Sequence, residues 1–339
     1  MRRKVIDYLY KNQLLTALFI LTTAWILLQL KDVLVALFIS YILVAALAPI
    51  ADFLEKKSIP KTIAVLIAYL TALLGIALIL LSLLPFLITQ ITTLFQQFPS
   101  YINNEINIFG INIDSSKINP IITSELESIG RSSLSITSRF FGGVFSTIAI
   151  IAISFYLLLG REKIKKSFAS LFPQKSQAKA LQIIEQSEDK LGSWLRGQII
   201  LSFAVGAITW LILTILGIEF ALPLAVLAGL LEIIPTIGPI IAAIPAVIVA
   251  LNISVPLAAV VTGSYILIQL TENNVLVPRI MQKAVGLNPI VIIIGIIVGG
   301  KTLGIIGALL SIPFISLIFL IAKSFDWDKN DSPQTTDKS

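Results

Sequence analysis

Residues 223–245 read PLAVLAGLLEIIPTIGPIIAAIP, a long apolar run that prolines interrupt near its middle. Pro235 and Pro239 each lack the backbone N–H of a helix and clash with the preceding turn, so one regular helix is excluded. Each arm has about 12 residues and would be about 18 Å long, whereas a hydrocarbon core is about 30 Å thick. We therefore expect a re-entrant helical hairpin, whose irregular backbone must be covered by protein or line a water-filled cavity.

A second broken run, at 289–322, repeats this pattern. The two runs share five residue types at offsets 0, 6, 13, 15 and 19: Pro223, Gly229, Thr236, Gly238 and Ala242, and Pro289, Gly295, Thr302, Gly304 and Ala308. The alternative is chance similarity between two membrane segments rich in Gly and Ala. The apolar arm 303–322 is long enough to span by itself, which leaves the side of the C-terminus open.

Composition places the whole chain in a membrane. Of 339 residues, 56% are hydrophobic and 13% are charged, against about 25% charged in soluble domains. The absence of histidine and cysteine excludes Ser-His hydrolases, thiol nucleophiles, disulfides and the usual haem and zinc sites. Gly295 to Thr302 match a phosphate-loop pattern, but they lie in an apolar segment without an acidic magnesium partner. We expect no enzyme, no cofactor and no metal site.

Six further apolar runs are long enough, or nearly so, to cross a bilayer: 14–30, 33–50, 62–88, 142–159, 199–217 and 255–270. Together with the two broken runs they predict an all-α polytopic membrane protein. We expect about 7–8 transmembrane segments, with two re-entrant helical hairpins in an inverted repeat. The expected parts are the following: a three-span region (1–88), an extracytoplasmic polar loop (89–140), a fourth span (141–159), a cytoplasmic amphipathic segment (160–197), a transport core (198–322) and a disordered polar tail (323–339).

The orientation follows from lysine and arginine, which favour the cytoplasmic side. Four lie in the first eleven residues and eight in segment 160–197, so both segments are expected to be cytoplasmic. The net charge of +6 is then a topology signal, and no nucleic-acid partner is expected. Within segment 174–196, one apolar face predicts a helix lying on the membrane surface: Leu181, Ile184, Leu191 and Leu195. Loop 89–140 is interpreted as a structured cap or a contact in a homo-oligomer.

With this orientation, the span 199–217 runs outward and the first hairpin enters from outside. The span 255–270 runs inward and the second hairpin enters from the cytoplasm. In secondary transporters, broken segments at matching positions of inverted repeats indicate the substrate site.

Two carboxylates stand where these segments break or end. Glu232 lies three residues before Pro235, and Glu272 lies at the end of span 255–270, beside Asn273 and Asn274. Ionisable residues inside membrane segments are rare and usually functional. A carboxylate with neighbouring amide and hydroxyl oxygens, such as Glu272 has in its sequence, can hold a cation or a proton. A solvated helix end is the alternative for Glu272.

Several motifs also resemble a known family. They are Leu195-Arg196-Gly197-Gln198, Glu232-Ile-Ile-Pro235-Thr-Ile-Gly238-Pro239 with Pro245-Ala246, Gln269-x-x-Glu272-x-Asn274-x-x-x-Pro278-Arg279, Val285-Gly286-Leu287-Asn288-Pro289, Gly299-Gly300 and Pro313. Together they resemble the autoinducer-2 exporter family of transporters, also called PerM-like permeases.

The resemblance implies a multi-pass protein of the bacterial inner membrane that exports a small solute. Some members are described as exporters of the signal autoinducer-2, and others as sodium(lithium)/proton antiporters. The family's Pro-Gly-Pro motif falls on Pro235, Gly238 and Pro239, and its Gln-Glu-Asn-Pro-Arg motif falls on Gln269, Glu272, Asn274, Pro278 and Arg279. The first motif often carries Asn where this chain has Glu232, which leaves room for a role of Glu232 that is specific to this member.

The sequence therefore predicts an ion-coupled secondary transporter by alternating access, with lipid, a small-molecule solute and a sodium ion or proton as partners. The alternatives are a sodium(lithium)/proton antiporter and a non-transporting scaffold or passive channel. Arg279 and Lys301 are candidate counter-charges, with a snorkelling lysine as the alternative for Lys301. The expected substrate and ion path comprises Glu232, Pro235, Gly238, Pro239, Gln269, Glu272, Asn273, Asn274, Arg279 and Lys301.

Overall fold

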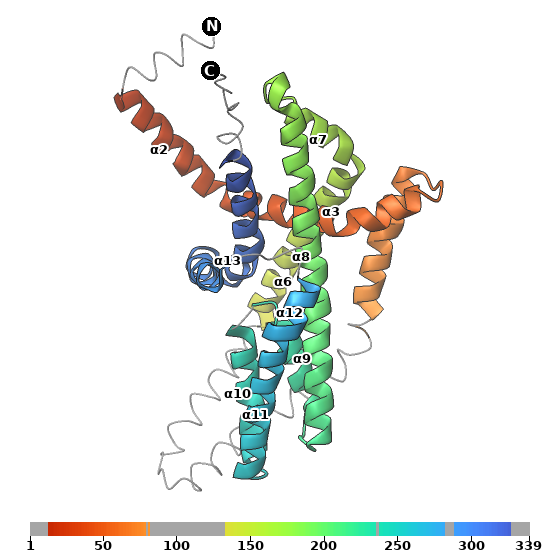
Figure 1. The fold of residues 1–339 in the computed structure, drawn as a ribbon, viewed down its shortest axis with the longest axis vertical. Helices are drawn as coiled ribbons and strands as arrows, with labels where there is room; N and C mark the ends of the chain where they lie inside the picture. Colours follow the sequence, from red (N-terminus) through yellow and green to blue (C-terminus); the bar gives the residue numbers. More distant parts are fainter. Residues whose placement is uncertain (1–12, 79–80, 82–132, 235–236, 282–287, 327–339) are drawn as a thin grey trace, which may run out of the picture.

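The computed structural model describes residues 13–78, 81, 133–234, 237–281 and 288–326 (Figure 1). These residues are almost entirely helical, and no strand occurs among them, which confirms the all-α prediction. Most of the predicted loop 89–140 and most of the tail 323–339 lie outside the described ranges.

The helices are α2 (Gln13–Gln29), α3 (Lys31–Glu55), an unlabelled helix (Lys61–Leu78), α6 (Ser133–Leu159), α7 (Arg161–Ala169), α8 (Gln174–Ile215), α9 (Ala221–Leu231), α10 (Ile237–Leu251), α11 (Val255–Thr271), the π-helix η1 (Glu272–Leu276), α12 (Val277–Ile280) and α13 (Pro289–Asp326).

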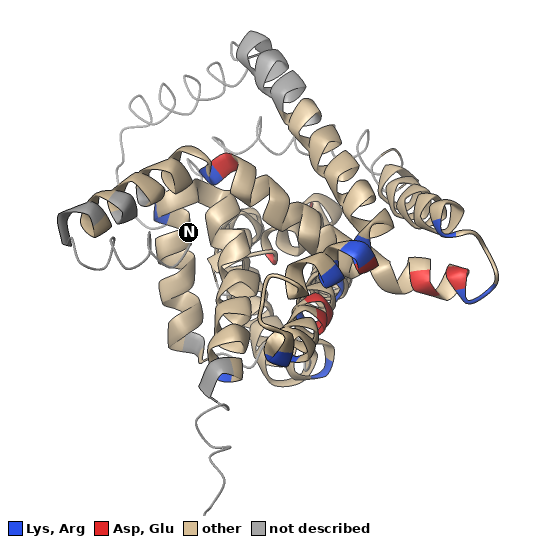
Figure 2. Cartoon of the chain, turned by 90° about the horizontal axis from the view of Figure 1, so that it is seen from above, with Lys and Arg blue, Asp and Glu red and all other residues tan. Residues whose placement is uncertain are grey.

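Several of these helices are long and apolar enough to cross a bilayer. Within the described ranges there are five, or six if α6 and α7, which meet at a bend of 75°, form one span. The five are Lys31–Glu55, Lys61–Leu78, Gln174–Ile215, Val255–Ile280 and Ile290–Ser324. Charged residues appear only as short coloured stretches on the ribbon (Figure 2). The chain is therefore a polytopic membrane protein, while the predicted number of 7–8 segments stays a prediction.

Alanines are prominent among the buried residues and many large apolar side chains are exposed, as expected when lipid is the solvent. Ala64, Ala242 and Ala246 have no exposed surface, whereas Phe203 and Ile215 are about three-quarters exposed. Small side chains let helix backbones approach closely, because lipid offers no hydrophobic driving force between helices. The alanines and glycines of this chain therefore set which helices meet.

Helix α8 is the central element, in contact with α3, α7, α9, α11, α12 and α13 (Figure 1). Its 42 residues make a helix about 63 Å long at 1.5 Å per residue, so it extends well beyond a hydrocarbon core. The prediction of a surface helix over 174–196 is wrong, because this segment continues without a break into the span. Its apolar face packs on α3 instead: Leu191 and Trp194 share a buried cluster with Ile42 and Ala45.

Both broken runs fold as two helical arms joined by a break. In the first run, α9 and α10 pack together, and the backbone of Gly238 lies directly on the carbonyl of Leu231. In the second, α13 breaks at Gly304, whose φ of 64° and ψ of −147° suit only glycine. Its arms touch where Gly299 faces Gly307. The prediction that these hairpins are re-entrant remains a prediction.

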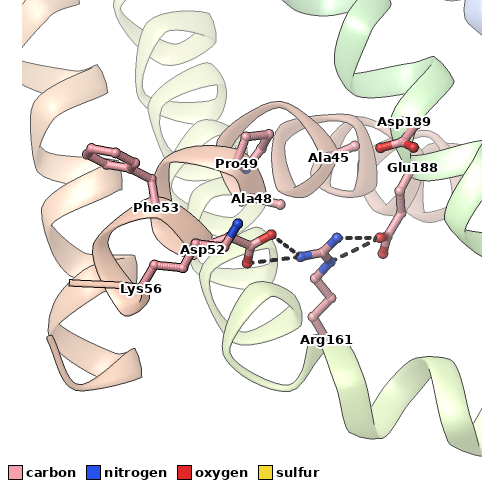
Figure 3. A pocket seen from close by; sticks show the side chains of 9 residues that line it. All are labelled: Ala45, Ala48, Pro49, Asp52, Phe53, Lys56, Arg161, Glu188 and Asp189. Carbon is pink, nitrogen blue, oxygen red and sulfur yellow. Dashed lines mark hydrogen bonds and ion pairs between the residues drawn. The ribbon is translucent and has the colours of Figure 1, made fainter. Parts of the chain in front are cut away.

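Arg161 joins three helices at the junction of α6 and α7 (Figure 3). Its guanidinium lies 2.9 Å from Asp52 Oδ2 on α3 and 2.9 Å from Glu188 Oε2 on α8, and Lys165 Nζ lies 3.6 Å from the same Glu188 oxygen. A cavity of about 350 Å³ beside this network is lined by Asp52, Arg161, Glu188 and Asp189, among others. Because arginine is always charged, the contact ties the amino-terminal helices to α8.

We predict that Arg161→Leu lowers the thermal stability of the protein. The side chain of Glu188 is only 4% exposed, and a buried charge left without its main partner costs about 3 kcal/mol; Lys165 offsets part of this cost. Asp52→Asn is the matched control, because the Asp52 side chain is 47% exposed and such a pair contributes about 1 kcal/mol or less. The measurement is the unfolding midpoint in detergent, followed by tryptophan fluorescence. Equal shifts for the two variants would show that the arginine does not stabilise the junction.

Candidate functional site

Glu272 begins an irregular turn in the helix that α11 starts. Residues Glu272–Leu276 form one turn of π-helix, in which the N–H of Val277 donates to the carbonyl of Glu272. Pro278 explains the irregularity, because a proline in an α-helix removes a donor and clashes with the carbonyl four residues earlier, here Asn274. Such π-turns are frequent at functional sites, and this one sets the direction of the Glu272 side chain.

Glu232 occupies the other break, directly after α9. Its N–H still donates to Ala228, at 3.0 Å, and its own carbonyl accepts a bond of 2.8 Å from Nε2 of Gln198 on α8. Gln198 is itself buried, with 3% of its surface exposed. A side-chain amide therefore satisfies a backbone carbonyl that the broken helix leaves open.

The carboxyl groups of Glu232 and Glu272 meet inside the protein. The two carboxyl groups lie close enough to influence each other electrostatically, and Glu272 Oε2 accepts a bond of 2.8 Å from Nε2 of Gln269. Glu232 has no exposed surface and Glu272 has 2%. Neither carboxyl oxygen of Glu232 accepts a hydrogen bond from any described residue. Two carboxyl groups that the sequence separates by a span thus form one site.

The pair has no basic partner in the described part of the chain. Two adjacent carboxylates repel each other, and removing charge from water is costly unless an opposite charge or a proton offsets it. The chemistry open to this pair is therefore to hold a shared proton or a small cation between carboxylate and amide oxygens. Two acidic side chains, with no third in the described ranges, form no multidentate acidic metal site.

Two apolar clusters border the pair. One contains Ala228 and Tyr265, where α8 to α11 meet, and the other contains Leu201, Ile268 and Met281. Along the chain, Glu272 lies between Ile268 and Met281 of the second cluster. The burial of the pair among these apolar residues strengthens any electrostatic interaction that it makes.

The other predicted path residues lie elsewhere. Gly238 is buried in the contact with Leu231, Pro239 is partly buried at the start of α10, and Pro235 lies outside the described residues. Four residues are exposed: Asn273, Asn274, Arg279 and Lys301. Arg279 and Lys301 do not reach the carboxyl pair, so the structure gives no support to their role as counter-charges.

Gln198 is the site residue that sequence reasoning did not include. It stood in the family motif beside Arg196, but it was not assigned to the path. The sequence feature that could have identified Gln198 is its polar amide at the start of an apolar span. A buried amide with two N–H donors usually needs a hydrogen-bond partner inside the protein. Its partner, a carbonyl of another helix, was not visible from spacing.

Comparison with known proteins finds similarity over most of the chain. The family model described as "AI-2E family transporter" matches residues 14–325. "Putative transport protein YrrI" of Bacillus subtilis (strain 168) is 26% identical over 309 residues, 86% of each chain. "Putative transport protein YueF" of the same organism is 29% identical over 295 residues, 82% of this chain and 79% of its own. "AI-2 transport protein TqsA" of Escherichia coli (strain K12) is 34% identical over 136 residues, 40% of each chain.

The packing of α8 on α9 supplies a test of how the site is positioned. A Cβ atom on Gly229 would lie 2.8 Å from the carbonyl oxygen of Ser202, whereas one on Gly263 in α11 would have nothing within 4 Å. We predict that Gly229→Ala pushes α9 away from α8 and displaces Glu232, which lowers both the unfolding midpoint and transport. Gly263→Ala is the matched control. It gains about 1 kcal/mol of helix propensity without a clash, so its midpoint stays equal or rises.

The two variants are compared by thermal unfolding in detergent and by uptake in proteoliposomes. If Gly229→Ala were as stable and active as Gly263→Ala, the close approach of α8 and α9 would not position the site.

Proposed function

This chain belongs to the AI-2E family of transporters, and from that premise we propose that it exports a small polar solute by ion-coupled secondary transport. As a member it is a multi-pass inner-membrane transport protein. The name of TqsA supports a solute similar to autoinducer-2, over the two-fifths of the chain that align with it. The distribution of lysine and arginine supports a cytoplasmic N-terminus.

The observation that carries the proposal is the buried contact between Glu232 and Glu272. A carboxyl pair that binds and releases a proton or a sodium ion changes its charge. That change alters the cost of keeping the pair between two apolar clusters. Ion binding therefore favours one arrangement of the surrounding helices over another, which is the requirement for coupling.

Both carboxyl groups sit at breaks in helices. A break lacks some of the backbone hydrogen bonds of a regular helix, so we expect it to move more readily than the helices on either side. Glu232 follows α9 at the break of the first hairpin, and Glu272 begins the π-turn after α11. In alternating access, the apolar packing around the pair would open toward one side of the membrane and then toward the other. Binding sites at discontinuous helices near the centre of a repeat are typical of secondary transporters.

The sodium(lithium)/proton antiporter is the second candidate, and the same contact favours it. Two acidic side chains with neighbouring amide oxygens suit exchange of one monovalent cation for a proton. A scaffold or passive channel has no need of an uncompensated carboxyl pair, which is costly in a membrane. A homo-oligomer stays a prediction.

We predict that Glu272→Gln removes the response of transport to a pH gradient. The experiment uses purified protein in liposomes, with labelled autoinducer-2 as the solute and entrapped pyranine as the proton reporter. Gradient-driven solute flux should fall by about tenfold or more, the rate equivalent of losing a charged interaction. Glu185→Gln, which changes an exposed acid on α8, should behave as the wild type. Coupled flux that is unchanged in Glu272→Gln would contradict the assigned role.

The same liposomes separate the candidates. Sodium-driven proton flux without solute supports the antiporter. Accelerated uptake of labelled solute into vesicles preloaded with unlabelled solute supports the exporter, and no exchange of either kind supports a scaffold.

A further inference from the structure

Serine and threonine in these helices follow a consistent pattern. Their hydroxyls donate to a carbonyl one turn back on the same helix, which satisfies them inside a membrane. Bonds of 2.7–2.8 Å of this kind are made by Thr22, Thr147, Ser187, Thr262, Ser264, Thr271 and Ser324.

Three buried hydroxyls on α8 and α11 depart from this pattern. Ser202 and Thr209 on α8 and Tyr265 on α11 have hydroxyl oxygens that are inaccessible to solvent and make no hydrogen bond with any described residue. Thr209 has no exposed surface at all, and Tyr265 has 8%. A buried hydroxyl without a partner is costly, and each such group in a native structure needs an explanation.

The three hydroxyls continue the row of polar groups that begins at the pair. On α8, Ser202 lies one turn beyond Gln198, which binds the carbonyl of Glu232, and Thr209 lies two turns further. On α11, Tyr265 precedes Gln269 by four residues and Glu272 by seven, so the three share one helix face.

The two rows lie on neighbouring antiparallel helices, α8 and α11. Gly197 packs on Ile280 and Met281 at one end of the contact, and Leu213 shares a buried cluster with Tyr265 at the other. Ser202 and Thr209 are separated by about 10 Å along the helix, as are Tyr265 and Glu272. The hydroxyls thus extend from the pair toward the Ile215 end of α8, and they stop at the apolar cluster around Leu213.

We propose that Ser202, Thr209 and Tyr265 line a narrow proton path between the Glu232 and Glu272 pair and the Ile215 end of α8, and that the apolar cluster around Leu213 closes this path in the present conformation. A hydroxyl both donates and accepts, so it receives one proton from a neighbouring water and releases its own to the next group. The proton that leaves the carboxyl pair is passed along this row, and no group in the row changes its net charge. Water has polar partners here and lacks them in the apolar cluster beyond. The inference rests on the proposed function, because a proton path is needed only if the Glu232 and Glu272 pair exchanges protons.

The test measures proton exchange at the pair directly and needs no transported solute. Full-length protein in lipid is transferred to D₂O, and infrared spectroscopy follows the carbonyl stretch of protonated carboxyl groups, which shifts when deuterium replaces the proton. Glu232→Gln and Glu272→Gln identify the part of the band that belongs to the pair. We expect Thr209→Val and Tyr265→Phe to slow the shift by about tenfold, comparable to the loss of one hydrogen bond in the row, and Ser202→Ala to slow it as well.

Two variants separate the path from a general structural effect. Ser316→Ala removes another buried hydroxyl without a partner, but on α13, and should exchange at the wild-type rate. Thr209→Ser keeps the hydroxyl and should restore fast exchange.

The possible failures are distinguishable. Wild-type exchange rates in all three hydroxyl variants would overturn the path while leaving a protonated pair in place. The absence of any band that depends on Glu232 and Glu272 would show that the pair holds no proton. It would then overturn the path together with proton coupling.

Discussion

Two carboxyl groups that meet without a basic partner impose the strongest constraint on this structure. In a membrane, neither water nor a distant charge relieves such a contact, so the surrounding helices must supply what the pair needs. Gln269 donates to Glu272, and Gln198 satisfies the open carbonyl of Glu232. What remains uncompensated is the carboxyl pair itself, and under the proposed function a mobile proton or cation binds there. A purely structural contact would have no reason to remain in this condition, and this links the architecture to transport.

The packing that produces this contact depends on small residues. Gly229 lets α9 approach the backbone of α8, and Gly192 lets α8 approach the carbonyl of Ala45 on α3. Helix α8 therefore connects the amino-terminal helices, held at Arg161, to the helices that carry the two acids. Because both acids sit at breaks, small movements of α9 or of the π-turn change their separation. The same elements that create the site also give it a means of responding to its occupant.

The helices and their breaks could be predicted from the sequence, whereas the contact between Glu232 and Glu272 could not. Pro235 and Pro239 predicted the first break, and the shared offsets assigned Gly238 and Gly304 to equivalent positions. The structure has a close backbone approach at Gly238 and a positive φ at Gly304. Glu232 and Glu272 stood out because charge is rare in apolar runs. Their contact was not predictable, because it depends on the rotation of α9 and α11 about their axes. For the same reason, Arg279 and Lys301 looked suitable by spacing but lie on exposed faces. The amphipathic face of 174–196 was read correctly as apolar, but its partner is α3 and not the membrane surface.

The absence of native cysteine allows the central contact to be tested directly. Glu232→Cys and Glu272→Cys combined in one chain place two thiols where the carboxyl groups meet, and mercuric ion bridges two thiols that lie close together. The account predicts one tightly held mercury per chain, seen by intact mass, that resists removal by a chelator. Each single variant, and Glu232→Cys combined with Lys301→Cys, should lose its mercury. Equal loss from the 232/272 pair would contradict the claim that these two residues form one site.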